Sequence, residues 1–182
     1  MRSLPSSKTY AWWLAIARIL TGLAWLSHGV PKFTHGAAFM PPGGLMGDYV
    51  THGLQIADPT YRGFLASVVQ PNIAIFAELV RLGEVLVGLS LLLGALTRVG
   101  GFFGVFLTLN YIAARGGLLS SSTLQSADFA LMLLSFVALV LPTGRVLGVD
   151  ALLGKRAPKV ETVRAEFVPE PQRDGPSAPP NA

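Results

Sequence analysis

Three charged residues interrupt an otherwise aliphatic stretch between Phe76 and Leu96, at intervals of three: Glu78, Arg81 and Glu84. Residues at this spacing fall within one arc of about 120° on an α-helix. An arginine between two carboxylates can form an ion-pair network, and a carboxylate beside a cation can also exchange protons with a bound ligand. Which chemistry applies depends on whether the helix lies in water or in lipid.

The composition indicates a membrane protein. Of the 182 residues, 51% are hydrophobic and 13% are charged, whereas soluble domains carry about 25% charged residues. About 20 mostly apolar residues are needed to cross a hydrocarbon core of about 30 Å. Four segments meet this requirement: Ala11 to Pro31, Ile73 to Leu96, Thr97 to Gly117 and Ser126 to Val146. We therefore expect an all-α integral membrane protein, with a four-helix bundle in residues 1–155.

The first segment is expected to remain in the protein. Its apolar stretch is too long for a cleaved signal peptide, Arg18 interrupts it, and no clear cleavage site follows it. The chain has no cysteine, so no disulfide and no thiolate metal site are expected.

The distribution of basic residues predicts the orientation. Seven of them lie near one side of the predicted spans: Arg2, Lys8, Arg98, Arg145, Lys155, Arg156 and Lys159. Only Lys32, Arg62 and Arg115 lie near the other side. Because the cytoplasmic side carries the excess of lysine and arginine, both termini of this multi-pass protein are predicted in the cytoplasm, at the cytoplasmic membrane. Anionic lipid headgroups explain the net charge of +4 without a nucleic acid.

Two regions lie outside the predicted spans. Residues 156–182 are rich in proline and mixed charge, which is typical of a disordered cytoplasmic tail. Lys32 to Asn72 is expected to be a long outer loop. Within it, a helical pattern of apolar residues comprises Tyr61, Phe64, Leu65, Val68 and Val69. This pattern fits equally well an amphipathic helix on the membrane surface and a loop segment packed over the bundle.

Depth estimates place most polar residues of the spans in the outer half of the membrane. At about 1.5 Å of rise per residue, Arg18 lies about 10 Å from the cytoplasmic end, whereas the others lie about 18 Å or more from it. Since buried charges cost at least about 2.5–3.5 kcal/mol each, they normally face protein or water. The candidate intramembrane polar cluster comprises Arg18, Trp25, Glu78, Arg81, Glu84, Asn110 and Asp128. It either staples the helices together or forms a pocket for a membrane-dissolved ligand or a proton.

Small residues predict where the helices approach one another. The span Ala11 to Pro31, with the residue that follows it, carries a single stripe of Arg18, Gly22, Trp25, Gly29 and Lys32. Small residues on such stripes allow close backbone approach. The residues predicted to pack helices are Gly22, Gly29, Gly88, Gly100 and Gly104.

Metal ligands are few. His28 and His35 are seven residues apart and His52 follows in the loop, but Pro31 and Gly36 disturb the geometry that a shared site would need. We interpret the three histidines as interfacial residues and expect no metal ion. We likewise expect no covalently bound cofactor.

Taken in order, five segments resemble the DoxX family, and more specifically the DoxD-like small subunit of thiosulfate:quinone oxidoreductase. They are ARILTGLAWLSHGVPKF, YRGFLASVVQPN, FAELVRLGEVLVGLSLLLGALTR, LNYIAARGG and TGRVLGVDALL. The resemblance covers about Ile16 to Leu153. The family positions that it implies are Arg18, Gly29, Lys32, Glu84, Gly88 and Asp150.

The resemblance implies a four-helix membrane bundle beside a redox partner, either a DoxA-like subunit or another soluble enzyme. The sulfur-oxidising members convert thiosulfate to tetrathionate and pass the electrons to quinone. No DoxA-like second domain is expected in these 182 residues. Two interpretations stay open: a quinone-facing subunit of an oxidoreductase, in which Arg18, Arg81 and Glu84 polarise quinone oxygens or relay protons, and a non-catalytic anchor or assembly subunit. A small transporter is a third, and the absence of an inverted repeat offers it little support.

Overall fold

The described part of the chain is helical. The structure, a computed structural model, describes residues 7–117 and 121–154, and within these ranges it contains helices and no β-strand. The predicted all-α class is therefore confirmed for these residues. The predicted tail, residues 156–182, lies outside them.

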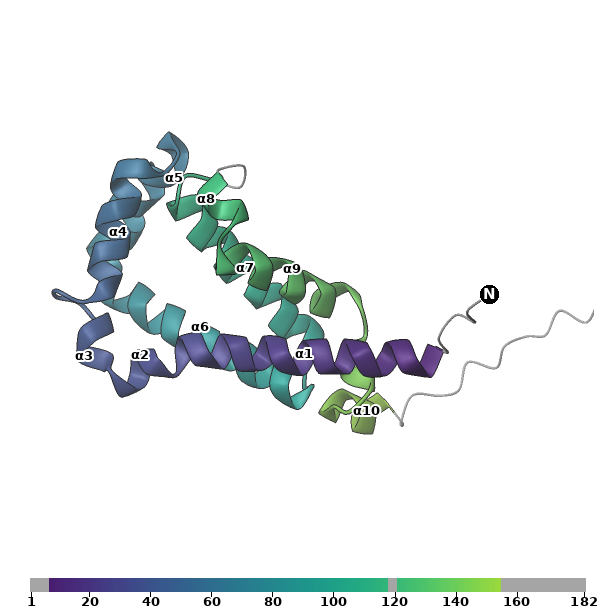
Figure 1. The fold of residues 1–182 in the computed structure, drawn as a ribbon. Helices are drawn as coiled ribbons and strands as arrows, with labels where there is room; N and C mark the ends of the chain where they lie inside the picture. The colour runs from purple at the N-terminus through teal and green to yellow at the C-terminus, as the bar shows by residue number, and fades with distance from the viewer. Residues whose placement is uncertain (1–6, 118–120, 155–182) are drawn as a thin grey trace, which may run out of the picture.

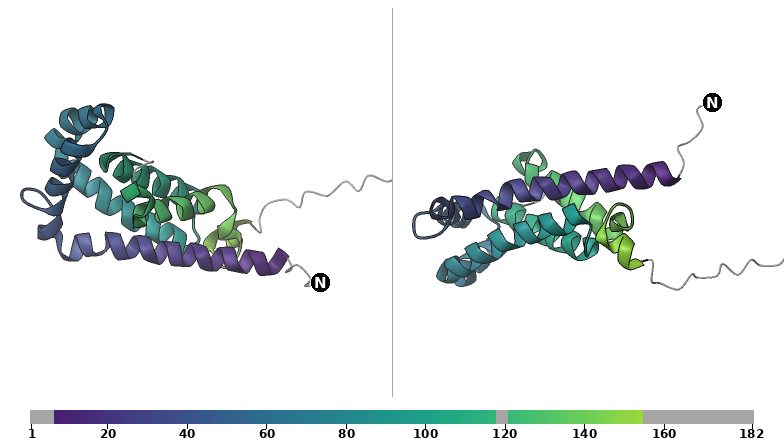
Figure 2. Two further views of the ribbon diagram at one scale, coloured as in Figure 1. Left: turned by 45° about the horizontal axis from the view of Figure 1, so that its top comes forward. Right: turned by 90° about the horizontal axis from the view of Figure 1, so that it is seen from below.

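The four longest helices of the described residues are α1 (Ser7–Gly29), α6 (Ile73–Leu93), α7 (Thr97–Ala114) and α9 (Ala127–Val140). Helix α1 lies along α6, and α7 lies along α9. The two pairs meet near α10 (Val149–Gly154) and spread apart toward α4 (Leu45–Ile56) and α5 (Pro59–Phe64) (Figures 1 and 2). The α6–α7 and α1–α9 contacts join the pairs.

The ends of these helices follow local chemistry. Helix α1 ends at Gly29, just before Pro31, which has no N–H to continue the hydrogen bonds of α1 and instead begins α2. Helix α6 ends where Gly94 takes up the left-handed conformation, with φ of 66°, which glycine adopts without strain. Helix α9 ends at Val140, six residues before the predicted Val146, because Pro142 interrupts it.

Glycines bring neighbouring helix backbones together. A Cβ at Gly22 would lie 2.5 Å from the backbone nitrogen of Leu92 and 2.9 Å from the carbonyl oxygen of Gly88, so α1 and α6 approach closely there. A Cβ at Gly101 would lie 2.5 Å from the backbone nitrogen of Leu139 in α9. Gly100 faces the Ser90 side chain in α6, and Gly104 faces Ser135. A side chain larger than hydrogen at these positions would force the helices apart.

The expected long outer loop is instead a folded helical cap, a name used here for residues 31–72. It consists of α2 (Pro31–Thr34), α3 (Gly36–Phe39), α4, α5, a π-helical stretch (Leu65–Val69) and a 3₁₀ turn (Gln70–Asn72). Its buried residues form a cluster of their own with Ala77 of α6: Phe39, Met46, Val50, Ala57, Leu65 and Val69. Because Leu65 and Val69 are buried there, the structure favours the segment packed over the other helices and not the helix on a membrane surface.

A second polar structure closes the opposite end, which we call the turn end: the α6–α7 turn (residues 94–96), the 3₁₀ turn Thr143–Arg145 and α10. Asp150 accepts hydrogen bonds from the backbone N–H groups of Leu96 (2.8 Å) and Thr97 (3.1 Å) and from the Thr97 hydroxyl (2.9 Å). The carboxylate thus caps the N-terminus of α7 from 53 residues away along the chain. In return, the Asp150 N–H donates to Gly94 O at 2.9 Å.

By length and hydropathy, one segment of the described chain qualifies as a membrane span: Thr9–Thr34, of 26 residues. Ala127–Val140 is apolar but shorter. The other predicted spans are not found by this criterion: α6 carries three charged residues, and α7 has 18 residues including Arg98. At about 1.5 Å per residue, α9 covers only about 21 Å.

Candidate functional site

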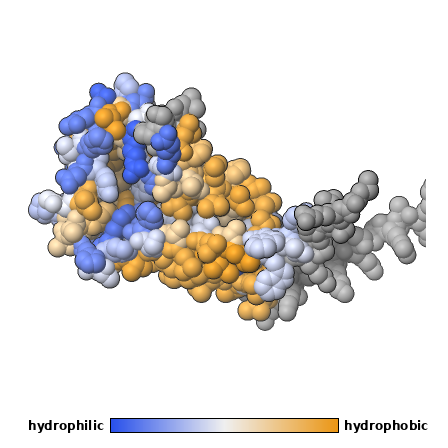
Figure 3. Space-filling model, viewed as in Figure 1, coloured by the Kyte–Doolittle hydropathy of each residue, from blue (hydrophilic) through white to orange (hydrophobic). Residues whose placement is uncertain are grey.

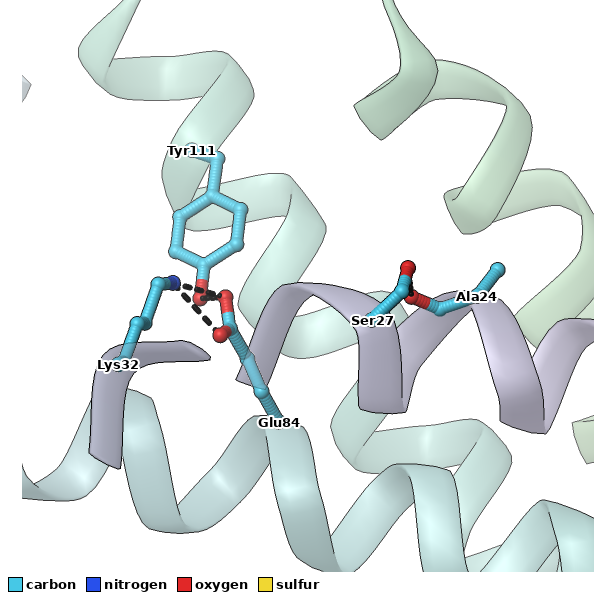
Figure 4. Close-up of polar contacts among 5 residues, drawn as sticks. All are labelled: Ala24, Ser27, Lys32, Glu84 and Tyr111. Atoms are coloured by element: carbon cyan, nitrogen blue, oxygen red, sulfur yellow. Dashed lines mark hydrogen bonds and ion pairs between the residues drawn. The ribbon is translucent and has the colours of Figure 1, made fainter. Parts of the chain in front are cut away.

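A nearly buried ion pair lies where α1 passes into the cap. Lys32 Nζ is 2.6 Å from both carboxylate oxygens of Glu84, and the Tyr111 hydroxyl donates to Glu84 Oε1 at 2.8 Å (Figure 4). The Glu84 side chain is 2% exposed and that of Lys32 is 20% exposed. Three elements, α2, α6 and α7, thus contribute one side chain each to what we call the Lys32–Glu84–Tyr111 triad.

Helix geometry and a missing side chain allow this arrangement. A Cβ at Gly29 would lie 3.0 Å from the Cβ of Glu84, so the end of α1 can pack against the base of the Glu84 side chain because Gly29 has no side chain. The turn into α2 then places Lys32 above Glu84. The Lys32 ammonium also lies 4.9 Å from the centroid of the Phe39 ring in α3, a distance at which a cation is attracted to an aromatic face.

The other two charges of α6 pair with each other. Arg81 donates to both carboxylate oxygens of Glu78, with Nε at 2.7 Å from Oε2. Its guanidinium lies 4.5 Å from the Phe33 ring centroid. The Glu78 side chain is 42% exposed, so this pair lies near the surface beside the cap.

Arg18 lies at the turn end, away from the triad. Its Nη2 donates to the carbonyl oxygen of Leu147 at 2.8 Å, and the residue is 2% exposed. Its charge acts on Asp150. Burial acts to raise the pKa of Asp150, but the hydrogen bonds from Thr97 and Leu96 together with the charge of Arg18 outweigh it, so the pKa is lowered from its ordinary value.

The remaining candidate residues form separate contacts. Trp25 is 1% exposed and its Nε1 donates to Ser135 Oγ in α9 at 3.1 Å. Asn110 accepts a hydrogen bond from the Tyr61 hydroxyl of α5 at 2.9 Å. Asp128 forms an ion pair with Arg115 at 2.7 Å. These contacts tie helices together or tie the cap to α7.

The structure therefore does not bring the seven candidate residues into one cluster. Glu84 pairs with Lys32 and not with Arg81, and Arg18 belongs to the opposite end. The depth estimate could not separate them, because it fixes a residue's height along a helix and not the direction of its side chain. The candidate cluster also lacked two members of the triad. Lys32 was named as a flanking cation, on the stripe with Gly29 and as a family position, but not as a member of the cluster, and Tyr111 was not singled out.

Five of the six family positions implied by the resemblance fall into two groups, and the sixth, Gly88, lies between α1 and α6. Gly29, Lys32 and Glu84 meet at the triad. Arg18 and Asp150 meet at the turn end. Gly88 faces Leu26 of α1, whose backbone nitrogen would lie 3.0 Å from a Cβ at that position. In the described residues, no group of three or more histidine, aspartate and glutamate side chains could hold a metal ion.

These features define an all-helical protein whose long helices bury charged groups between them and expose apolar side chains. Comparison with family models identifies the family to which the chain belongs. The model described as the TQO small subunit DoxD, where TQO is thiosulfate:quinone oxidoreductase, matches residues 13–169. The chain therefore belongs to the DoxD family, whose members are membrane-associated subunits of a multi-subunit complex. Comparisons with curated proteins and with solved structures give no match.

Proposed function

We propose that this protein is the quinone-facing membrane subunit of a thiosulfate:quinone oxidoreductase-like complex, and that the quinone headgroup binds beside the Lys32–Glu84–Tyr111 triad. The observation that carries this proposal is the triad itself. A carboxylate that is 2% exposed accepts hydrogen bonds from an ammonium and a phenol. Groups of this kind inside a membrane mark proton and ligand sites.

The surface supports insertion into a membrane. Each long helix carries apolar side chains that are more than half exposed: Leu20 in α1, Leu86 in α6, Phe102 in α7 and Phe136 in α9. Figure 3 shows apolar residues over the body of the molecule and polar residues over the cap. Only 33% of the most apolar part of Thr9–Thr34 is buried, whereas the core helix of a soluble protein would be mostly buried. Exposed apolar patches this extensive mark a surface that contacts lipid or protein.

In this proposal α1, α6, α7 and α9 form a transmembrane four-helix bundle within residues 1–155. Both termini and the segment 156–182 are cytoplasmic, and the cap is outside. Single cysteines at Asp58 in the cap and at Ser177 can be labelled on intact cells with a membrane-impermeant reagent. Labelling at Asp58 alone is expected. Labelling at Ser177 and not at Asp58 would reverse the orientation.

The chemistry of the triad suits a quinone. The Lys32 ammonium reaches the surface at one side, where it could donate a hydrogen bond to a quinone oxygen while Glu84 holds it in place. Quinone reduction takes up two electrons and two protons. The electrons come from a partner redox subunit, DoxA-like or another soluble enzyme, where two thiosulfate ions join to form tetrathionate and release two electrons. Glu84 and Tyr111 are the groups of this chain that would pass protons.

One observation favours the alternative of a non-catalytic anchor. Lys32, Glu84 and Tyr111 satisfy one another's hydrogen bonds, and such a triad can hold α2, α6 and α7 together without any ligand.

The test that separates the two functions uses membranes containing the protein and its partner. Quinone content after purification in mild detergent, and thiosulfate-dependent quinone reduction, are measured for the wild type, Lys32→Gln, Glu84→Gln and the control Arg62→Gln. Arg62 is an exposed cation of the cap. We expect both triad variants to lose bound quinone and activity, and Arg62→Gln to retain them. A wild type that carries no quinone and supports no activity with its partner would establish the anchor.

A further inference from the structure

The turn end contains an open pocket that the proposed function does not use. Its volume is about 330 Å³ and its lining comes from three segments: the start of α7, the 3₁₀ turn Thr143–Arg145 and α10. Pockets that bind small ligands in proteins begin at about 300 Å³. Arg98 and Arg145 both line it.

The pocket has an excess of positive charge. Arg98 and Arg145 are exposed, and the side chain of neither forms an ion pair or hydrogen bond within the described residues. Asp150 also lines the pocket, but both of its carboxylate oxygens accept hydrogen bonds from Leu96 and Thr97. The two guanidinium groups are therefore available to an anion. Arginine is well suited to phosphate because its planar fork can donate two parallel hydrogen bonds.

The same lining is apolar on one side. Leu96 is 67% exposed and Val99 is 50% exposed, and both line the pocket. Leu96 lies on the turn between α6 and α7, where its backbone has φ of 52°. A free phosphate ion would gain nothing from these apolar side chains. A phospholipid would place its phosphate between the arginines and its acyl chains along Leu96 and Val99.

From this combination we infer that the turn end binds the headgroup of an anionic phospholipid through Arg98 and Arg145. The inference rests on the proposed membrane orientation, since it places these arginines at the cytoplasmic surface of the bilayer. There a basic residue near anionic lipid contributes about 1 kcal/mol, which corresponds to about a fivefold change in affinity. Lipid binding would brace the contact between α10 and the α6–α7 turn.

The experiment measures lipid binding to the detergent-purified full chain by native mass spectrometry. Phosphatidylglycerol is the anionic probe, phosphatidylcholine is the zwitterionic one, and inorganic phosphate is the competitor. For the wild type we expect tighter binding of phosphatidylglycerol and no displacement by millimolar phosphate. Arg98→Gln and Arg145→Gln should each weaken phosphatidylglycerol binding about fivefold, and the double variant about 25-fold, with phosphatidylcholine binding unchanged.

Two further variants control for charge and folding. Arg62→Gln removes a cation from the cap and should leave phosphatidylglycerol affinity unchanged. The double change of Arg98 and Arg145 to lysine retains the charge but loses the planar fork, so it should weaken phosphatidylglycerol binding less than the glutamine double variant does. Unchanged phosphatidylglycerol binding in the glutamine double variant would overturn the site. Displacement by phosphate would mean that the site binds a free anion and not a lipid. Either of these results would overturn the lipid site without contradicting the quinone site of the proposed function. Recovery of the wild type in the soluble fraction without detergent would instead overturn the membrane location, on which both proposals rest.

Discussion

Removing Lys32 should destabilise the fold more than removing any other exposed or half-exposed cation of the described chain. In Lys32→Met, the Glu84 carboxylate would keep only the hydrogen bond from Tyr111. Stranding one member of a buried ion pair costs about 3–5 kcal/mol. Because Lys32 is itself 20% exposed and the Tyr111 bond remains, we expect the lower end of that range, about 3 kcal/mol.

The double-mutant cycle isolates the interaction. Glu84→Gln removes the buried charge, so Lys32→Met in that background no longer leaves a carboxylate without its cation. The double variant should therefore lose less free energy of unfolding than the sum of the single variants, by about 2 kcal/mol or more. The matched cycle uses Arg81→Met and Glu78→Gln. That pair has a carboxylate that is 42% exposed, and exposed pairs contribute about 0–1 kcal/mol.

The assay is reversible unfolding in mixed micelles, with increasing sodium dodecyl sulfate followed by far-ultraviolet circular dichroism. Each variant gives a free energy of unfolding, and the four members of a cycle give the coupling energy. A Lys32–Glu84 coupling below about 0.5 kcal/mol, or one smaller than the Arg81–Glu78 coupling, would show that the triad does not stabilise the structure as its geometry requires.

Three other predictions use the same unfolding assay. Tyr111→Phe removes one hydrogen bond to the Glu84 carboxylate and should lower the free energy of unfolding by about 1.5–3 kcal/mol; an unchanged value would mean that the phenol does not donate to Glu84. Because the folded pKa of Asp150 is lowered from 3.8, its stabilisation is fully present above about pH 4 and is lost as pH falls through the folded pKa. The advantage of the wild type over Asp150→Asn should therefore be constant from about pH 5 to 8 and shrink in acid, and a gap that widened in acid would contradict the sign. Gly101→Ala places a Cβ 2.5 Å from a backbone nitrogen of α9 and should cost about 1–3 kcal/mol, whereas Gly47→Ala, with nothing within 4 Å, should be neutral or stabilising.

The sequence allowed the long helices to be predicted because proline and glycine end them. The segment beginning at Ile73 and the segment beginning at Thr97 start where α6 and α7 start. The cap was missed as a folded unit for a different reason. Its helices are short, and its buried residues come from α3, α4, the loop residue Ala57 and the π-helical stretch, so no single apolar run in the sequence predicts a core.

For the site, spacing along one helix was a poor guide. Glu78, Arg81 and Glu84 share an arc, yet Glu84 is buried while Glu78 is not, because helix packing covers only part of that arc. The partners of Glu84 come from residues 52 and 27 positions away, and periodicity carries no signal for such contacts. The resemblance gave more, since its set of positions includes Lys32 and Glu84, which the structure joins in an ion pair, as well as Arg18 and Asp150, which lie together at the turn end.

The capping of the α7 N-terminus by Asp150 has a consequence for the order in which the chain is made. A ribosome delivers α6, the turn and α7 well before residue 150, so the first N–H groups of α7 meet their carboxylate partner only after α9 has been synthesised. Until then the joint between the second and third long helices is incomplete. The arrival of Asp150, followed by its own N–H bond to Gly94, is what closes it, so the last helix in the described chain completes a turn that was translated more than fifty residues earlier.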